Sequence, residues 1–322
     1  MKGMELSRRY FDEYGLPMLK QKFPQYIDKM AAGLAGVGSE CLGFDDEYSQ
    51  DHDFGAGFCI WLPDDLYRSI GEEIQKEYDR LPETYMGISR NITAMNPGRT
   101  GAMSTEDFYF RYTGLRRAPQ DNMEWFRIPE HFLATVTNGQ VFMDRLGQFT
   151  DIRTALLGYY PEDVLRKKLA ARCAVMAQAG QYNYPRCIKR GERSAAYLAC
   201  AEFIKAALSA VYLLNRRYMP FYKWSFRGTD DLPLLKNAAS ALRKLSLTDD
   251  AGAYDTAKQD LIENICIDVI SEMNRQHLTY VTETFMEAQA LDLMKYVDEI
   301  NMEYGGEGTK LYTTAGSKFK KI

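Results

Sequence analysis

A Gly-Ser pair followed by an Asp-His-Asp triplet is the feature that most constrains the fold of this chain. Gly38-Ser39 precedes Asp51-His52-Asp53, and the apolar run Phe58–Leu62 comes next. On an extended segment, side chains at i and i+2 point to the same face, so Asp51 and Asp53 would lie side by side. Two carboxylates held so close repel each other unless a cation lies between them. The sequence therefore predicts a metal site formed by Asp51 and Asp53.

The donor set and the residues before it indicate which ligands this site would take. A hard divalent ion suits oxygen ligands, and Mg²⁺ (or Mn²⁺ in its place) also binds triphosphates. Gly38 and Ser39 supply exposed backbone N–H groups and a hydroxyl that can hold phosphate oxygens. Together these residues predict a metal-dependent nucleotide site, with ATP or another nucleoside triphosphate as the substrate.

The block that runs from Gly38 to Gly55 resembles the nucleotidyltransferase superfamily with the polymerase-beta-like fold. It reads Gly-Ser-Glu-Cys, then Asp-Asp-Glu, then Ser-Gln-Asp-His-Asp-Phe-Gly. The nearest resemblance, over most of the chain, is to a bacterial subfamily with a helical C-terminal half; kanamycin and streptomycin nucleotidyltransferases are more distant. The resemblance implies an α+β fold, in which a small mixed-sheet nucleotidyltransferase domain precedes an all-helical bundle. It also implies transfer of a nucleoside monophosphate, first of all AMP from ATP, to a hydroxyl of a small-molecule acceptor.

Composition sets limits on the class of protein. A chain of 322 residues has room for two domains, and 46% hydrophobic and 26% charged residues are near globular averages. The net charge of −4 argues against a general nucleic-acid binder. The six cysteines are scattered without a CxxC pair, which indicates reduced, buried thiols. We see no apolar run near the ~20 residues of a membrane span and no signal peptide, so we expect no membrane partner and a cytoplasmic location.

The pattern of the N-terminal half predicts helices and strands in alternation. Residues 5–36 have helical spacing that Pro17 and Pro24 interrupt, and the last helical piece would run from Gln25 to Leu34. Phe58–Leu62 is a buried-strand candidate, and Pro63-Asp64-Asp65 would open a helix that continues to Tyr78. We expect a loop over 86–99, a strand or a short helix over 101–110, and a hairpin or a strand and turn over 139–147.

From Pro161 onward the pattern becomes helical. We expect five helices, over residues 162–178, 194–217, 233–245, 254–277 and 282–304. The expected domains are therefore residues 1–155, the catalytic domain, and residues 156–322, the helical domain.

Two groups beside the paired aspartates have more than one interpretation. His52 points to the opposite face from Asp51 and Asp53, and a packed, hydrogen-bonded histidine is the favoured interpretation. The acidic segment Asp45-Asp46-Glu47 is typical of a solvated turn. Its alternative role is an outer shell for a metal or for a substrate amine.

A third carboxylate usually completes such a site by binding metal or by removing the acceptor's proton. Glu106 and Asp107 follow Ser104-Thr105, a pattern typical of a helix N-cap, and Asp144 has a turn-like context. For each of the three, a structural role is favoured. Glu192 is the alternative base, because some antibiotic nucleotidyltransferases supply the base from the helical domain.

A second polar block, in the helical half, contains cations that could reach a triphosphate. It spans residues 178–192 and continues over residues 214–224. We predict that Arg186, Arg190, Lys223 and Glu192 face a cleft between the domains, because a triphosphate with one Mg²⁺ keeps net negative charge. The alternative for this block is a buried polar network between helices.

Two other functions remain open from the sequence. Without a clear third carboxylate, the chain could be a nucleotide-binding sensor with little or no turnover. The acceptor could also be a protein or an RNA. The sequence identifies neither the acceptor nor the oligomeric state.

Overall fold

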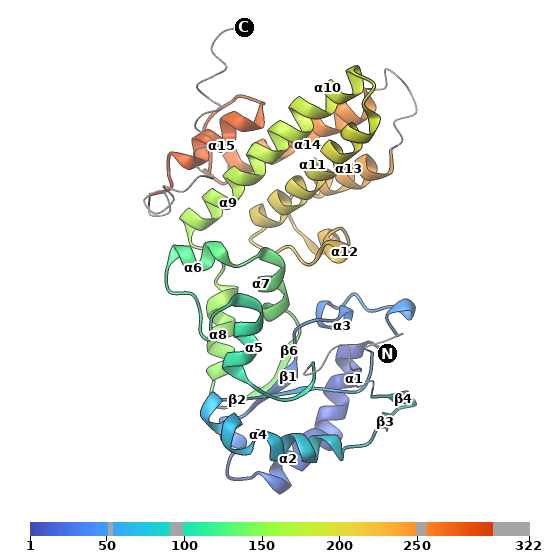
Figure 1. Cartoon of the computed structure of the whole chain (residues 1–322), viewed down its shortest axis with the longest axis vertical. Coiled ribbons are helices and arrows are strands. Elements are labelled where there is room, and N and C mark those ends of the chain that lie inside the picture. Colours follow the sequence, from blue (N-terminus) through green and yellow to red (C-terminus); the bar gives the residue numbers. More distant parts are fainter. Residues whose placement is uncertain (51–53, 91–98, 249–255, 299–322) are drawn as a thin grey trace. The chain divides into compact units, whose positions relative to one another are not determined.

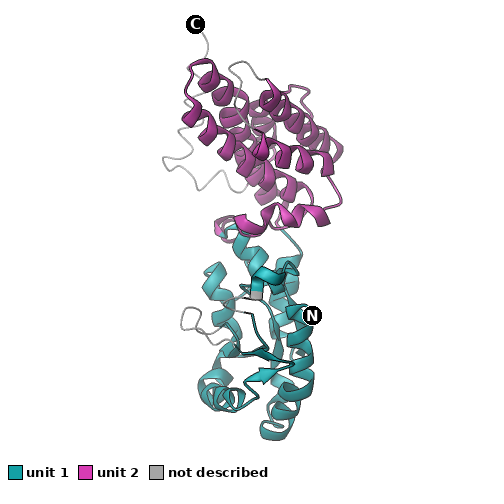
Figure 2. Ribbon diagram, turned by 90° about the vertical axis from the view of Figure 1, so that its right-hand side faces the viewer, with its two compact units in different colours: residues 1–119, 128–159 teal, residues 120–127, 160–322 magenta. Residues whose placement is uncertain are grey.

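The computed structural model describes residues 1–50, 54–90, 99–248 and 256–298, which form two compact units. Unit 1 contains residues 1–119 and 128–159, and unit 2 contains residues 120–127 and 160–322 (Figure 2). A mixed four-stranded sheet lies among the helices of unit 1, and unit 2 is largely helical (Figure 1). The α+β class predicted from the sequence is confirmed. The expected domain boundary at residue 155 falls inside helix α8 (Gln148–Leu157).

The four-stranded sheet has the order β5-β2-β1-β6. Its strands are β1 (Ala31–Leu34), β2 (Cys59–Leu62), β5 (Gly101–Ser104) and β6 (Gln140–Asp144). β1 pairs antiparallel with β2 and with β6, whereas β2 and β5 are parallel. The end of β1 therefore meets the starts of β2, β5 and β6 at one edge of the sheet, which we call the turn edge.

Strand β1 corrects a prediction, because the helix expected from Gln25 to Leu34 does not form. The chain makes only a 3₁₀ turn, η2 (Ile27–Lys29), and then enters β1, whose four residues are all buried. The segment Ala31-Ala32-Gly33 carries no strand signal of its own. Its small side chains fit between β2 and β6, and a Cβ at Gly33 would collide with the Gln140 carbonyl. Tertiary packing overrides the helix propensity of alanine here.

Alternating side chains of β2 face two different helical layers. Ile60 and Leu62 belong to the core formed with α1 (Gly3–Tyr10), α2 (Leu16–Lys22) and α4 (Asp64–Asp79). The π-helical turn η1 (Phe11–Gly15) joins α1 to α2. The strand predicted at 58–62 and the helix predicted after Pro63 are both confirmed.

Trp61 points to the other face, where α5 (Thr105–Thr113) and α8 lie. Its ring stacks on Phe149 with centroids 3.9 Å apart and meets Phe108 edge-on at 5.6 Å. Residues 101–113 thus contain both a strand and a helix, the two options that the sequence left open. The region expected as a loop contains the hairpin of β3 (Thr84–Tyr85) and β4 (Ile88–Ser89), while its residues 91–98 lie outside the described ranges.

The remaining helices are short pieces in unit 1 and a bundle in unit 2. Unit 1 also holds α3 (Ser39–Leu42), the 3₁₀ turn η3 (Glu47–Gln50) and α7 (Glu130–Thr137). The elements of unit 2 are α6 (Asn122–Arg127), α9 (Glu162–Val175), π-helical η4 (Met176–Asn183), α10 (Tyr184–Lys189), α11 (Arg193–Leu214), α12 (Tyr222–Ser225), 3₁₀ turn η5 (Arg227–Asp231), α13 (Lys236–Leu247), α14 (Ala257–Arg275) and α15 (Met286–Met294). All five predicted helices are present, although the last ends at Met294 and its predicted end lies outside the described residues.

Helix α11 departs from the expectation that no segment is long and apolar enough for a membrane. By length and composition alone it could cross one, but 61% of its most apolar window is buried inside the protein. Its buried residues include Phe203, Ala207 and Val211. This burial is what a central core helix of unit 2 requires.

Candidate functional site

The predicted Gly-Ser pair lies at the turn edge of the sheet. The chain leaves β1 at Leu34, turns through Gly36-Val37-Gly38, and starts α3 at Ser39. Asp51 and Asp53 lie outside the described residues. In the sequence they stand between η3 and Phe54, so they belong to the same β1–β2 connection as the Gly-Ser turn.

The backbone of this turn requires glycine. Gly36 has φ of 113° and Gly38 has φ of 131°, conformations that side chains disfavour. A Cβ on Gly38 would also collide with the Arg99 guanidinium and the Glu40 carboxylate. The Arg99 guanidinium thus lies close to the Gly38 backbone.

Asn138 fixes the start of the turn. The Gly36 N–H donates to Asn138 Oδ1 at 2.9 Å, and Asn138 Nδ2 donates to the Gly36 carbonyl at 2.7 Å. Arg153 Nη1 in turn donates to the Asn138 carbonyl at 2.6 Å. Because Asn138 lies two residues before β6 and Arg153 lies on α8, these contacts tie the turn to the sheet and to α8.

Arg99 and Glu40 form a buried ion pair at the other end of the turn. Arg99 Nη2 donates to Glu40 Oε1, and Arg99 Nε donates to the Val37 carbonyl at 3.1 Å. The two side chains are only 12% and 9% exposed. Burial lowers the pKa of the Arg99 guanidinium, which nevertheless stays charged at neutral pH. Neither Arg99 nor Asn138 was predicted from the sequence, because only strand pairing brings residues so far along the chain to the turn.

The first turn of α3 carries no side-chain cap in the described part of the chain. Ser39 itself is partly exposed. At the start of β2, Cys59 Sγ donates to the Arg99 carbonyl at 3.2 Å, and burial raises the pKa of Cys59 to about 12 and that of Cys41 still further. The two thiols are therefore neutral packing groups, whereas the Gly38-Ser39 backbone and the Ser39 hydroxyl are the groups suited to an anionic ligand.

The acidic segment after α3 divides into a buried and an exposed part. Asp45 is 4% exposed and accepts a hydrogen bond from the Gly3 N–H at 2.9 Å, and Lys2 forms an ion pair with it. Its carboxylate thus anchors the N-terminus of α1, where the helix dipole favours negative charge. Asp46 and Glu47 are exposed, as a solvated turn requires.

Glu106, Asp107 and Asp144 have the structural roles that the sequence favoured. Glu106 accepts a hydrogen bond from Gln148 Nε2 at 2.8 Å. Asp144 accepts from the N–H groups of Gly147 and Thr150, both at 2.8 Å, and so orders the start of α8. The Asp107 N–H donates to the capping Ser104 hydroxyl at 3.2 Å.

The sheet register places these three acids away from the Gly-Ser turn. Asp144 pairs with Ala31 at the start of β1, and Ser104, which precedes Glu106, pairs with the last residue of β2. They therefore follow the opposite edge of the sheet, about 13 Å away for a four-residue strand. Within the described ranges, no group of three His, Cys, Asp or Glu residues could hold a metal ion.

The predicted residues of unit 2 fall into two groups. Arg186 stacks on the Tyr182 ring at 3.9 Å, and Arg190 and Glu192 are exposed in the α10–α11 connection. Lys223 lies on α12, over the Trp224 ring at 5.1 Å.

Helix α11 separates these two groups (Figure 1). Arg190 precedes its start, whereas α12 packs at its end, where Tyr212 Oη donates to the Ser225 carbonyl at 2.7 Å. A helix of 22 residues is about 33 Å long. The structure does not bring Lys223 together with Arg186, Arg190 and Glu192.

Two polar residues of this block, Gln181 and Asn215, form the network between helices that was the alternative interpretation. Gln181 donates to Glu263 at 2.7 Å and to the Thr284 carbonyl at 3.0 Å. Asn215 accepts from the Leu234 N–H at 2.8 Å. These side chains hold helices together and are not available to a nucleotide base.

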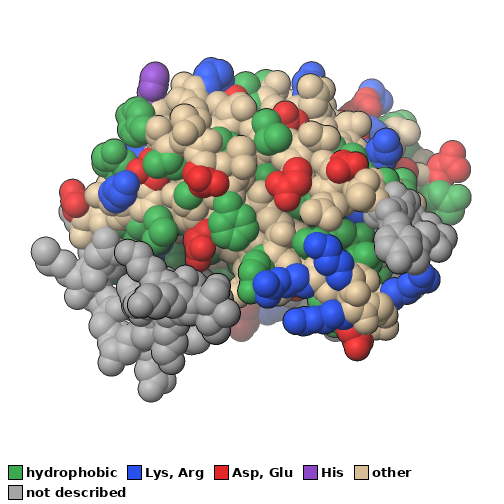
Figure 3. Space-filling view, turned by 90° about the horizontal axis from the view of Figure 1, so that it is seen from above, with side chains coloured by type: hydrophobic (Ala, Val, Ile, Leu, Met, Phe, Trp, Pro, Cys, Tyr) green, Lys and Arg blue, Asp and Glu red, His purple; other side chains and the backbone are tan. Residues whose placement is uncertain are grey.

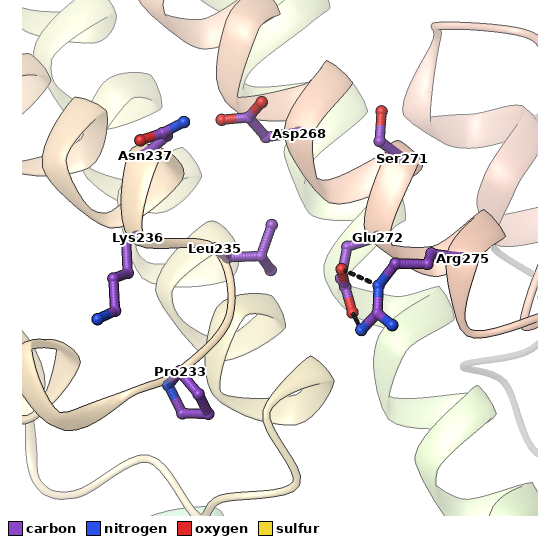
Figure 4. Close-up of a pocket in the computed structure, with 8 residues that line it drawn as sticks. All are labelled: Pro233, Leu235, Lys236, Asn237, Asp268, Ser271, Glu272 and Arg275. Atoms are coloured by element: carbon purple, nitrogen blue, oxygen red, sulfur yellow. Dashed lines mark hydrogen bonds and ion pairs between the residues drawn. The ribbon is translucent and has the colours of Figure 1, made fainter.

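Unit 2 has two notable surface features, of which the first extends the predicted cations Arg186 and Arg190 and the second was not predicted. Figure 3 looks onto the top of Figure 1, where α10 lies, and shows a group of Lys and Arg side chains there; α10 and the start of α11 carry exposed Arg186, Lys189, Arg190 and Arg193. A hollow of about 350 Å³ lies between α13 and α14 (Figure 4). It is lined by Pro233, Leu235, Lys236, Asn237, Asp268, Ser271, Glu272 and Arg275. On one wall of this hollow, Arg275 forms an ion pair with Glu272 at 2.6 Å.

Comparison with known proteins gives a family match over part of the chain and a distant similarity to a solved structure. Residues 125–225 match a family described as a domain of unknown function (DUF4037), a stretch that does not include the Gly-Ser turn. No curated protein matches the chain. The chain is similar to the crystal structure of a nucleotidyltransferase-like protein from Exiguobacterium sibiricum 255-15. The TM-score is 0.39 and the identity 12%, over 94% of this chain and 88% of that chain.

Proposed function

We propose that this chain is a Mg²⁺-dependent nucleotidyltransferase. It would move a nucleoside monophosphate, in the first instance AMP from ATP, to a hydroxyl of a small-molecule acceptor. One observation carries the proposal. The Gly38-Ser39 turn is fixed at the end of β1 by Asn138 and Arg99, in the same β1–β2 connection as the Asp51-His52-Asp53 sequence.

The donor set of that connection fits the metal that the proposal needs. Asp51 and Asp53 would hold Mg²⁺, or Mn²⁺, because paired carboxylates are the ligands that hard divalent ions prefer. When bound, the ion neutralises negative charge on the reacting phosphates.

The chain's own groups would bind and orient the nucleotide. Gly38 and Ser39 offer backbone N–H groups and a hydroxyl to the terminal phosphates, and the fixed turn keeps these donors in place before the ligand arrives. From unit 2, Arg186 and Arg190, or else Lys223, would add positive charge, and Glu192 would accept the acceptor's proton. Because α11 separates the cations, one triphosphate could meet only one of the two groups.

A nucleotide-binding sensor with little turnover is the second candidate. The observation that favours it is the place of Glu106, Asp107 and Asp144 at the opposite edge of the sheet from the Gly-Ser turn. None of these three can complete a metal site at the turn edge.

Pyrophosphate release separates the two candidates. The wild-type chain, incubated with labelled ATP, Mg²⁺ and a panel of hydroxyl acceptors, is expected to release pyrophosphate and to form labelled product. The double variant Asp51→Ala/Asp53→Ala should do neither, while Asp65→Ala, which changes an exposed acid on α4, serves as the control. Equal release by the wild type and the double variant would refute the transferase. ATP binding by calorimetry without any product would favour the sensor.

A further inference from the structure

Arg99 lies where a ligand of the Gly-Ser turn would need positive charge. It stands two residues before the start of β5, and β5 begins at the turn edge because Gly101 pairs with Cys59. The side chain reaches from there to the turn, where its guanidinium occupies the space beside Gly38 that a Cβ would need. The Arg99 guanidinium, which comes from the segment before β5, is thus held against the Gly38 backbone, which follows β1.

The contacts of Arg99 fix the orientation of the guanidinium. Its Nε–Nη2 edge is turned to the Val37 carbonyl and to Glu40. A guanidinium is planar and presents its donors in a rigid fork, so contacts along one edge define the whole plane. Since Glu40 is also almost fully buried, neither partner of the pair can turn away into solvent without leaving the other charge unpaired.

This arrangement suits phosphate recognition better than a role as a tether alone. Asn138 already ties the turn to the sheet through two uncharged hydrogen bonds. A buried cation is costly unless it is paired, and Glu40 provides that pairing in the absence of a ligand. Arginine is the residue that best matches the geometry of phosphate oxygens.

We propose that Arg99 is the phosphate-binding cation of the Gly-Ser turn and that Glu40 is the residue that positions it. The proposal rests on the proposed function, since it assigns to Arg99 the terminal phosphates of the nucleoside triphosphate. It also explains why a glycine is needed at position 38, where the guanidinium would lie between the backbone and the ligand.

The test is the gain in affinity with each added phosphate, measured by calorimetry with AMP, ADP, ATP and inorganic triphosphate in the presence of Mg²⁺. The double variant Glu40→Gln/Arg99→Met removes both charges of the pair and so leaves no single buried charge. Its affinity for ATP and triphosphate should fall at least tenfold, while its affinity for AMP changes little. The matched control is Asp28→Asn/Arg145→Met, which removes another ion pair of unit 1, outside the turn. This control should bind all four ligands as the wild type does.

The outcomes distinguish the inference from the function on which it rests. If the wild type gains affinity with each phosphate and the Glu40→Gln/Arg99→Met variant gains as much, Arg99 is only a tether, and the proposed function stands. If all four affinities fall by the same factor, the pair is likewise structural. If the wild type binds none of the four ligands, both proposals fail. Should the double variant not fold, Arg99→Lys, which keeps the charge and removes the fork, should show the same selective loss for ATP.

Discussion

At the scale of single residues, some groups of the candidate site could be predicted from the sequence and others could not. Gly38 and Ser39 belong to a recognisable motif, and the structure explains the glycine by its φ of 131° and by its contact with Arg99. Arg99 and Asn138 belong to no local pattern. They reach the turn only because β5 and β6 start at the edge where β1 ends, so no reading of neighbouring residues could find them.

Gly38→Ala should be more damaging than an ordinary glycine substitution. The backbone conformation alone costs about 1–3 kcal/mol with a side chain, and the new Cβ must also displace the Arg99–Glu40 pair. Gly43→Ala is the matched control, because Gly43 also has positive φ, 74°, but nothing lies within 4 Å of a Cβ there. Urea unfolding should show a larger loss of stability for Gly38→Ala than for Gly43→Ala. Equal losses would mean that the packing against Arg99 is unimportant.

At the scale of elements, predictions succeeded where the local signal was strong. Phe58–Leu62 is an uninterrupted apolar run, and Pro63 followed by two aspartates is a strong helix start, so β2 and α4 were both predicted. β1 was missed because Ala31-Ala32-Gly33 fits a helix as well as a strand. Its partners on both sides decide its conformation, and these partners lie far away in the sequence.

Asn138→Ala should test whether the edge of the sheet fixes the turn. The substitution removes two hydrogen bonds to Gly36, which together contribute about 1–3 kcal/mol. We expect a loss of stability of that size in urea unfolding and weaker ATP binding in calorimetry. Thr135→Ala, which removes one hydrogen bond on the nearby helix α7, is the control for stability and should leave ATP binding unchanged. Unchanged ATP affinity in Asn138→Ala would show that the turn does not need this clamp.

At the scale of the whole molecule, the architecture was predicted from the sequence, but the placement of the cations in unit 2 was not. The α+β architecture and the helical second half were predicted from the sequence and are confirmed. The separation of Lys223 from Arg186 and Arg190 could not be predicted, because it depends on α11 running as one uninterrupted helix between them.

Arg190→Ala and Lys223→Ala should therefore differ in their effect on nucleotide binding. A lost charge-assisted hydrogen bond weakens ATP binding by about 1.5–3 kcal/mol, and we expect this loss for one of the two variants only. Both side chains are exposed, so thermal stability without ligand should hardly change. Equal weakening by both substitutions would contradict the separation that α11 imposes.

A crystal structure with a non-hydrolysable ATP analogue and Mn²⁺, which is located by its anomalous signal, would show directly where the metal and the nucleotide bind. We expect the metal at coordination distance from the carboxylates of Asp51 and Asp53, close to the about 2.0–2.1 Å of Mg²⁺, whose place Mn²⁺ takes. We also expect the terminal phosphates against Gly38 and Ser39. A metal and a nucleotide bound elsewhere on the chain would contradict the proposed function.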